Sequence, residues 1–263
     1  MNMRHRPGLA LGTYQIGAAL GVAGWWVYWF VAKKNVTTTP IADRMYENAF
    51  PVGDFVFAVG LVVAGLAWHG VVANRHAAAG LVVGGMGMGL AALDTFHNVL
   101  VGAFDHASAG TLAQKLVFAV VNASVGALSV ACTWRHRATI GLDANADVSS
   151  NTVLRIAMVG LVALVDAVAI WVVGRDVNPD VIPFLKSMLA PCLLAATFAA
   201  IGAIRPPRAP WVLASAGVMV HRWLLVATSD ANRMLWLAAI TALVVSAWTA
   251  EVARRGTRSL AGS

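Results

Sequence analysis

Charged residues are scarce in this chain of 263 residues, and their scarcity narrows the class of protein at once. Asp, Glu, Lys and Arg together make up 12% of the sequence, whereas hydrophobic residues make up 59%. Soluble domains average about 25% charged residues, and a water-soluble protein of this length needs that charge to cover its surface. Intrinsic disorder is excluded as well, because disordered chains combine low hydrophobicity with high charge. The composition therefore predicts a polytopic membrane protein rather than a soluble enzyme.

Cysteine and recognisable catalytic motifs are also nearly absent. The two cysteines, Cys132 and Cys192, lie in apolar stretches without a CxxC pair, which argues against a disulfide framework or a redox dithiol. The chain contains no HExxH, GxSxG, Walker or Asp-rich prenyltransferase motif. Its chemistry must therefore be inferred from where polar residues fall relative to the membrane.

Acidic residues are fewer than basic ones, 12 against 19, which gives a net charge of +7. In a soluble protein this surplus would indicate nucleic-acid binding. Here most Lys and Arg flank apolar segments, so they indicate orientation in the bilayer, and we expect no nucleic-acid partner. Ten lie at the termini and even-numbered connections, against six at the odd-numbered ones. This bias favours both termini in the cytoplasm. The 15 Arg against 4 Lys, alongside abundant Ala, are typical of a GC-rich bacterial genome, so we expect the membrane to be a bacterial inner membrane.

Eight apolar runs are long enough to cross a bilayer, which takes about 20 residues of helix. They cover roughly 8–32, 52–74, 77–103, 111–134, 152–174, 183–204, 209–228 and 232–253. The predicted fold is thus an all-α membrane helix bundle of about eight transmembrane helices. Its layout allows two four-helix halves, 1–137 and 152–263, joined by a polar cytoplasmic linker over 138–151. No motif shared by the halves supports an internal repeat.

The third predicted span is rich in glycine, and its glycines are spaced for helix packing. Gly80 and Gly84, like Gly85 and Gly89, are four residues apart, a spacing that lets helix backbones approach closely. The run Gly-Gly-Met-Gly-Met-Gly does not indicate a phosphate loop, because no strand precedes it and it lies within a membrane span.

Polar residues inside the predicted spans gather in the outer leaflet. The inner half offers mainly Tyr14, Gln15 and His69. The outer half holds Asp54, Asp94, His97, Asn98, Lys115, Asp166, His221 and Arg222. Ionisable groups in a membrane are costly and mark functional sites, so this asymmetry indicates a polar vestibule that opens outward. The alternative is a set of buried ion pairs, such as Asp94 with Lys115 and Asp166 with Arg222.

The densest polar group lies where the second span begins and the third ends. Asp94, His97 and Asn98 share one helix face, because residues three and four apart are neighbours on a helix. Helix direction brings Glu47 and Asp54 to similar depth. We therefore expect Asp54, Asp94 and His97 to form a catalytic group. Glu47 and Asn98 would bind substrate, and the aromatic rings of Trp25, Tyr28 and Trp29 would cover it.

Several chemistries fit this group. Acid–base catalysis on a lipid or isoprenoid-like amphiphile needs a desolvated carboxylate or histidine as the proton donor or acceptor. An ion-coupled carrier would use the same residues as a relay, and a scaffold or accessory subunit would use them only to lock helices. A metal site has a single carboxylate-xx-His pair to build on, and bundle di-metal sites need two. His97 and His221 are the one pair placed for haem. We assign no metal and no cofactor.

Three observations separate these hypotheses. An enzyme should have a pocket that is open to lipid and closed toward the cytoplasm. A carrier should show polar groups that continue inward through Tyr14, Gln15 and His69. A scaffold should pair its charges and leave no cavity. The sequence leans against the carrier, because the inner half is so poor in polar residues.

Overall fold

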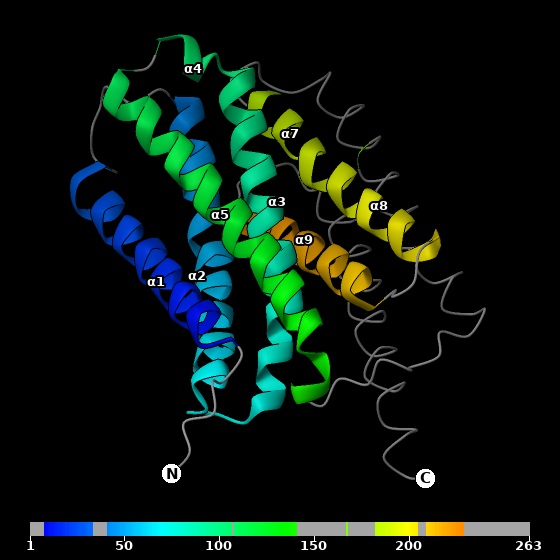
Figure 1. Cartoon of the computed structure of the whole chain (residues 1–263). Coiled ribbons are helices and arrows are strands. Elements are labelled where there is room, and N and C mark those ends of the chain that lie inside the picture. Colours follow the sequence, from blue (N-terminus) through cyan, green and yellow to red (C-terminus); the bar gives the residue numbers. More distant parts are fainter. Residues whose placement is uncertain are drawn as a thin grey trace.

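The computed structural model describes residues 8–33, 41–106, 108–140, 167, 182–204 and 209–228. Within these residues the chain is helical with short connections, and no strand occurs in this part of it (Figure 1). The all-helical prediction is therefore confirmed for the described part. The predicted spans 152–174, apart from residue 167, and 232–253 lie outside it, as do Asp166 and residues 141–151 of the predicted linker.

The first four predicted spans correspond to four long helices. Their elements are α1 (Leu9–Tyr28), which continues as the π-helical turn η1 (Trp29–Lys33), α2 (Ile41–His69), the 3₁₀ turn η2 (Asn74–Ala78), α3 (Ala79–Leu100) and α5 (Ala109–Arg135). The short helix α4 (Ala103–His106) joins α3 to α5, and the 3₁₀ turn η3 (Arg137–Ile140) follows α5. The remaining elements are α7 (Ile182–Ser187), α8 (Leu189–Ile204) and α9 (Ala209–Thr228).

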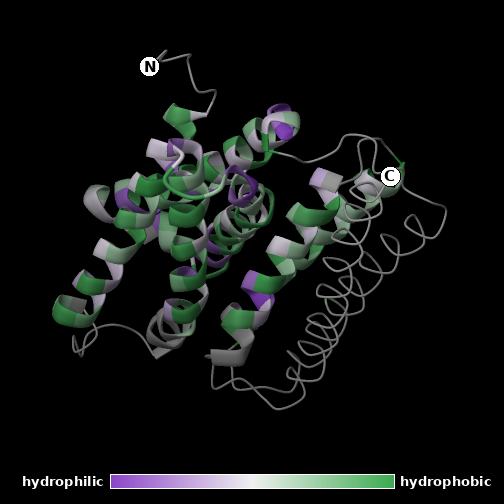
Figure 2. Ribbon diagram, turned by 90° about the horizontal axis from the view of Figure 1, so that it is seen from below, coloured by the Kyte–Doolittle hydropathy of each residue, from purple (hydrophilic) through white to green (hydrophobic). Residues whose placement is uncertain are grey.

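Four helices are long and apolar enough to cross a membrane: Leu9–Ala32, Ala49–His69, Asn74–Leu100 and Ala109–Arg135. Seen from below, most of the coloured ribbon of the described residues is green or pale, with purple residues scattered among them (Figure 2). Outward-facing residues are apolar as well, for example Leu20 and Val120, which are both largely exposed. A helix that is apolar all round suits a lipid environment. The chain thus has the helices of an integral membrane protein.

Helix α2 begins earlier than its apolar run suggests. The predicted span starts at residue 52, whereas α2 starts at Ile41 and carries Pro51 in its interior. The predicted span follows the apolar run, which starts after Pro51, and a proline inside a helix removes one backbone hydrogen bond and disfavours the preceding turn. The polar segment before Pro51 is helical nonetheless. At the beginning of α5 the Ser108 hydroxyl accepts a hydrogen bond from the Thr111 backbone N–H at 3.3 Å, which caps the helix.

Helix α3 occupies the centre of the described bundle and packs against α2, α5, α8 and α9. Its glycines make the closest approaches. A Cβ at Gly84 would lie 2.7 Å from the Gly126 carbonyl oxygen of α5, and one at Gly85 would collide with the Ala214 carbonyl oxygen of α9. The expectation that these glycines serve helix packing is confirmed. Helix α9, which belongs to the second predicted half, therefore packs directly on the first.

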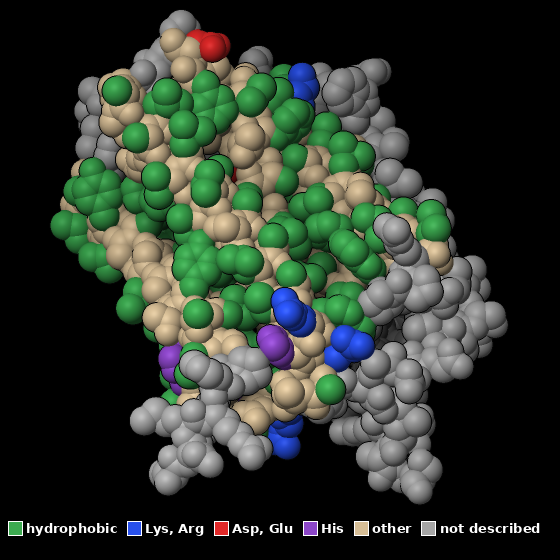
Figure 3. Space-filling view, in the orientation of Figure 1, with side chains coloured by type: hydrophobic (Ala, Val, Ile, Leu, Met, Phe, Trp, Pro, Cys, Tyr) green, Lys and Arg blue, Asp and Glu red, His purple; other side chains and the backbone are tan. Residues whose placement is uncertain are grey.

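The two ends of the bundle differ in charge. At one end, called here the η2 end, lie η2, η3 and the start of α1, and Arg75, His76 and Arg135 are accessible there. At the other, called the α4 end, α4 connects α3 with α5. Figure 3 shows a broad apolar surface across the middle of one face, with basic and histidine side chains gathered at its lower end. This distribution matches a membrane band with a basic border.

Candidate functional site

A cavity of about 570 Å³ lies in the α4 half of the bundle. Side chains of α1, η1, α2, α3 and α5 line it, so four separate stretches of sequence contribute. Its polar lining consists of Tyr14, Asp54, Asp94, His97, Asn98, Thr111, Gln114, Lys115 and Asn122. Its aromatic lining consists of Trp25, Trp26, Trp29, Phe50 and Phe118. Ligand pockets of roughly 300–1,000 Å³ with an apolar lining and a few polar groups are typical small-molecule sites.

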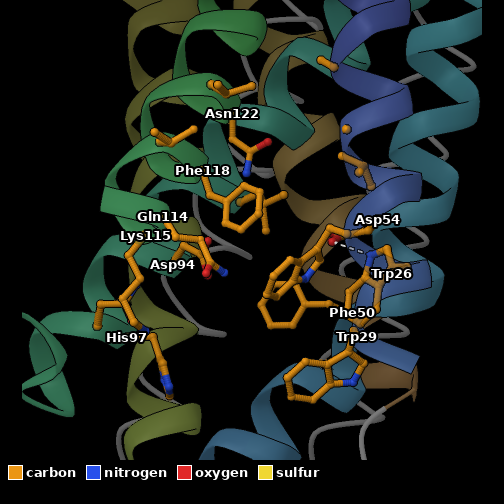
Figure 4. A pocket seen from close by; sticks show the side chains of 18 of the residues that line it. Trp26, Trp29, Phe50, Asp54, Asp94, His97, Gln114, Lys115, Phe118 and Asn122 are labelled. Carbon is orange, nitrogen blue, oxygen red and sulfur yellow. Dashed lines mark hydrogen bonds between the residues drawn. The ribbon is translucent and has the colours of Figure 1, made fainter. Parts of the chain in front are cut away.

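Most polar and aromatic side chains lie on opposite walls, whereas Phe118 lies among the polar residues of α5 (Figure 4). The polar wall is formed by α3 and α5, which contribute Asp94, His97, Gln114, Lys115 and Asn122. The facing wall is mostly aromatic and comes from α1, η1 and α2, with Trp26, Trp29 and Phe50. Asp54 is the acidic group on this aromatic wall. A molecule in the cavity would meet hydrogen-bonding groups on one side and rings on the other.

Asp54 is buried, with 7% of its surface exposed, and both of its carboxylate oxygens are engaged. Oδ2 accepts a hydrogen bond from the Trp26 indole N–H at 3.1 Å (dashed in Figure 4). Oδ1 lies 3.2 Å from Nε2 of His221, which is 2% exposed on α9. One carboxylate therefore ties together α1, α2 and α9. A buried carboxylate is tolerated only with such partners.

Asn98 and Lys115 join α3 to α5 on the polar wall. The Lys115 ammonium donates a hydrogen bond to the Asn98 side-chain oxygen. Asn98 is buried and Lys115 is half-buried. The ammonium is therefore held within the cavity wall rather than extended to the membrane surface. The sequence suggests an ion pair of Lys115 with Asp94, and it does not indicate the amide partner.

The rings near the end of α1 form a connected group. Trp25 packs against Tyr28 and Trp29, with ring centroids 5.7 and 6.3 Å apart. It also meets Phe118 of α5 edge-on, at 4.9 Å between centroids. This contact joins α1 to α5 at the edge of the cavity, and aromatic pairs commonly adopt such edge-to-face geometry. Trp29 is buried within the same group, at 5% exposure.

Six of the eight predicted site residues line this one cavity: Asp54, Asp94, His97, Asn98, Trp25 and Trp29. Tyr28 is not among the lining residues; it is 46% exposed and packs on Trp25 from outside. Glu47 lies on α2, two turns before Asp54, and its side chain is outside the described part. The structure thus brings the predicted residues together, although their chemical roles stay predictions.

Several lining residues went unnoticed in the sequence. Trp26 fits an interfacial aromatic belt at the end of the first span rather than a cavity wall. Phe50 and Phe118 look like ordinary apolar positions, and Gln114 stands near a helix start where polar residues are common. His221 was noticed as an intramembrane histidine, but its partner lies 167 residues away. The sequence does contain one indication for Trp26. It follows Trp25 directly, and adjacent side chains on a helix point in different directions, so one of the two tryptophans can point into the bundle.

Polar contacts continue from the cavity toward the η2 end. The Tyr14 hydroxyl, which lines the cavity, lies 2.6 Å from the Ser124 hydroxyl. One residue further along α1, the Gln15 side-chain amide donates to the Ser129 hydroxyl at 2.9 Å, and both side chains are fully buried. These pairs connect α1 to α5 below the cavity. The half of the bundle near the η2 end is therefore less uniformly apolar than its composition indicates.

The described residues contain no cluster of three His, Cys, Asp or Glu side chains that could hold a metal ion. No family model, no curated protein and no solved structure matches this chain. The function is therefore argued from the cavity itself.

Proposed function

We propose that this integral membrane protein binds an amphiphilic molecule of the lipid or isoprenoid kind in the cavity and acts on it by acid–base chemistry. The supporting observation is that one cavity combines an aromatic wall with a polar wall that carries Asp94 and His97. Such a lining offers separate surfaces to the apolar and polar parts of one ligand. A cavity of this size favours a binding role over that of a scaffold whose polar groups only lock helices.

Asp94 and His97 are the groups we assign to proton transfer. They lie three residues apart on α3, so they share a face, and both line the cavity. A carboxyl group and an imidazole at this spacing can serve as acid and base toward one bound molecule. Asp54 shares the cavity, but Trp26 and His221 already occupy both of its oxygens. We therefore assign Asp54 to positioning the aromatic wall rather than to the reaction.

Access to the cavity is lateral, between α1 and α5. Gly17 and Gly21 on α1 and Val117 on α5 line the cavity and are also exposed on the surface of the bundle. Small and apolar residues at such an edge would admit a chain from the bilayer. With the basic η2 end in the cytoplasm, as the distribution of Lys and Arg favours, the opening lies in the outer leaflet.

A second function, an ion-coupled carrier, is favoured by one observation. The contacts of Tyr14 with Ser124 and of Gln15 with Ser129 extend polar groups beyond the cavity toward the η2 end. A carrier needs such groups to pass its ion inward. No acidic side chain takes part in these contacts, so we place the carrier second.

The proposal is tested by comparing the lipids of cells that express the wild-type chain, Asp94→Asn, His97→Gln or the control Asp105→Asn. Asp105 is an exposed residue of α4 outside the cavity. Mass spectrometry of the extracts should show a lipid species that depends on the wild-type chain. We expect that species to be lost with Asp94→Asn and with His97→Gln and kept with Asp105→Asn. Conversion that persists in both cavity variants, at wild-type protein levels, would overturn the proposed chemistry.

A further inference from the structure

We infer that the ligand's head group is an uncharged planar ring that bears carbonyl or hydroxyl oxygens, as in a quinone with an isoprenoid tail. The inference rests on the proposed function, because it names the class of amphiphile that the same cavity would take. It follows from three properties of the cavity: the balance of its charges, its facing walls and the position of its opening.

The charges of the lining do not select an ionic head group. Lys115 and Asp94 carry opposite charges on the same wall. Asp54, on the other wall, is bonded by Trp26 and His221. A phosphate would meet two carboxylates beside one ammonium, and a quaternary ammonium would meet that ammonium beside the same carboxylates, so neither ion finds only opposite charge. Burying an unpaired charge is costly, so a neutral head group fits this lining best.

The walls favour a flat molecule. Trp26, Trp29 and Phe50 present rings on one side, and aromatic rings stack favourably on other rings in offset or edge-on arrangements. The facing wall presents side chains that donate hydrogen bonds, among them Gln114 and Asn122. Lys115 uses one N–H on Asn98 and has two more to donate. A ring with oxygens at its edge satisfies both walls at once.

The opening between α1 and α5 suits a long tail. A Cβ at Gly17 or Gly21 would meet no atom within 4 Å, and both glycines line the cavity. Val117 and Val121 of α5 line the cavity as well. This arrangement leaves space beside α1 through which a branched hydrocarbon chain can pass from the ring into lipid.

The test uses the full chain in nanodiscs and three probes with the same ten-carbon chain: a decyl-substituted benzoquinone, decyltrimethylammonium and decyl phosphate. Saturable binding is measured above that of empty nanodiscs. We expect the quinone to bind at least tenfold more tightly than either ionic probe. Tighter binding of an ionic probe would overturn the inferred head group while leaving an amphiphile site intact. Absence of saturable binding by all three probes would count against the inference and the proposed function together.

A matched pair of variants ties binding to this cavity. Gly21→Leu places a side chain in the tail opening, whereas Gly24→Leu adds the same atoms on the same helix at a position that does not line the cavity. Neither added Cβ meets a neighbouring atom, so both variants should fold. We expect Gly21→Leu to weaken quinone binding at least tenfold and Gly24→Leu to leave it unchanged. Equal affinities for the two variants would show that the quinone binds elsewhere and would overturn the inference.

Discussion

The carboxylate of Asp54 and the imidazole of His221 meet in the buried core, 3.2 Å apart, although 167 residues separate them in the chain. Both side chains are almost fully buried, and they connect α2 with α9. Trp26 holds the other oxygen of the same carboxylate from α1. This group forms the back of the aromatic wall, so it links the stability of the bundle to the shape of the cavity.

Replacing His221 by leucine should destabilise the protein. The substitution leaves Oδ1 of Asp54 buried without its partner, and an unsatisfied buried polar group costs about 1–3 kcal/mol, with more for a charged one. We expect the free energy of unfolding in detergent to fall by about that amount. Asp105→Asn is the control, because surface changes usually stay within about 0.5 kcal/mol. Equal unfolding transitions for wild type and His221→Leu would show that the contact contributes nothing.

Asp54 should also couple the effects of Trp26 and His221. Trp26→Phe keeps a ring but removes the N–H that donates to Oδ2. Residues that share one hydrogen-bonded partner show interaction energies of about 0.5–3 kcal/mol. We therefore expect the double variant with His221→Leu to depart from additivity by that amount. In an Asp54→Leu background both substitutions should become nearly additive, and persistent coupling there would contradict a link through the carboxylate.

The glycines of α3 and α1 should respond oppositely to alanine. A Cβ at Gly85 would collide with the Ala214 backbone, which cannot yield as a flexible side chain can, whereas a Cβ at Gly24 meets nothing. Overpacking costs about 1–3 kcal/mol or more, and glycine in a helix is about 1 kcal/mol less favourable than alanine. Gly85→Ala should thus lower the unfolding transition, and Gly24→Ala should raise it slightly. Similar transitions in thermal unfolding of the two variants would contradict close packing of α3 on α9.

Much of the fold could be predicted because apolar runs and glycine spacing are local properties. The four long helices follow from hydrophobic length alone, and the close approach of α3 to its neighbours follows from Gly84 and Gly85. The early start of α2 could not be predicted, since a proline at position 51 normally argues against helix before it. The packing of α9 on α3 depends on long-range contacts that no local pattern records.

The site divides in the same way. Asp94 and His97 were predicted together because helix periodicity places them on one face. Asp54 could be placed near Asp94 and His97 because the second and third spans run in opposite directions. The start of one and the end of the other therefore lie at similar depth in the membrane. The partner of each polar group is set by helix rotation and crossing, which hydrophobicity does not determine. Sequence alone therefore did not show that Lys115 bonds Asn98 or that Trp26 and His221 hold Asp54.

The polar pairs below the cavity provide a test between the enzyme and the carrier. Gln15 donates to Ser129, and both are fully buried. Replacing both partners of a buried hydrogen bond by apolar groups is often nearly neutral for stability, so the double variant Gln15→Leu with Ser129→Ala should fold. If the cavity alone carries the function, lipid conversion in this variant should equal that of wild type, and neither protein should move protons in liposomes that contain a pH-sensitive dye. Proton flux in the wild type that the double variant loses, at equal insertion, would reverse our ranking, because it would show that the inner polar pairs conduct.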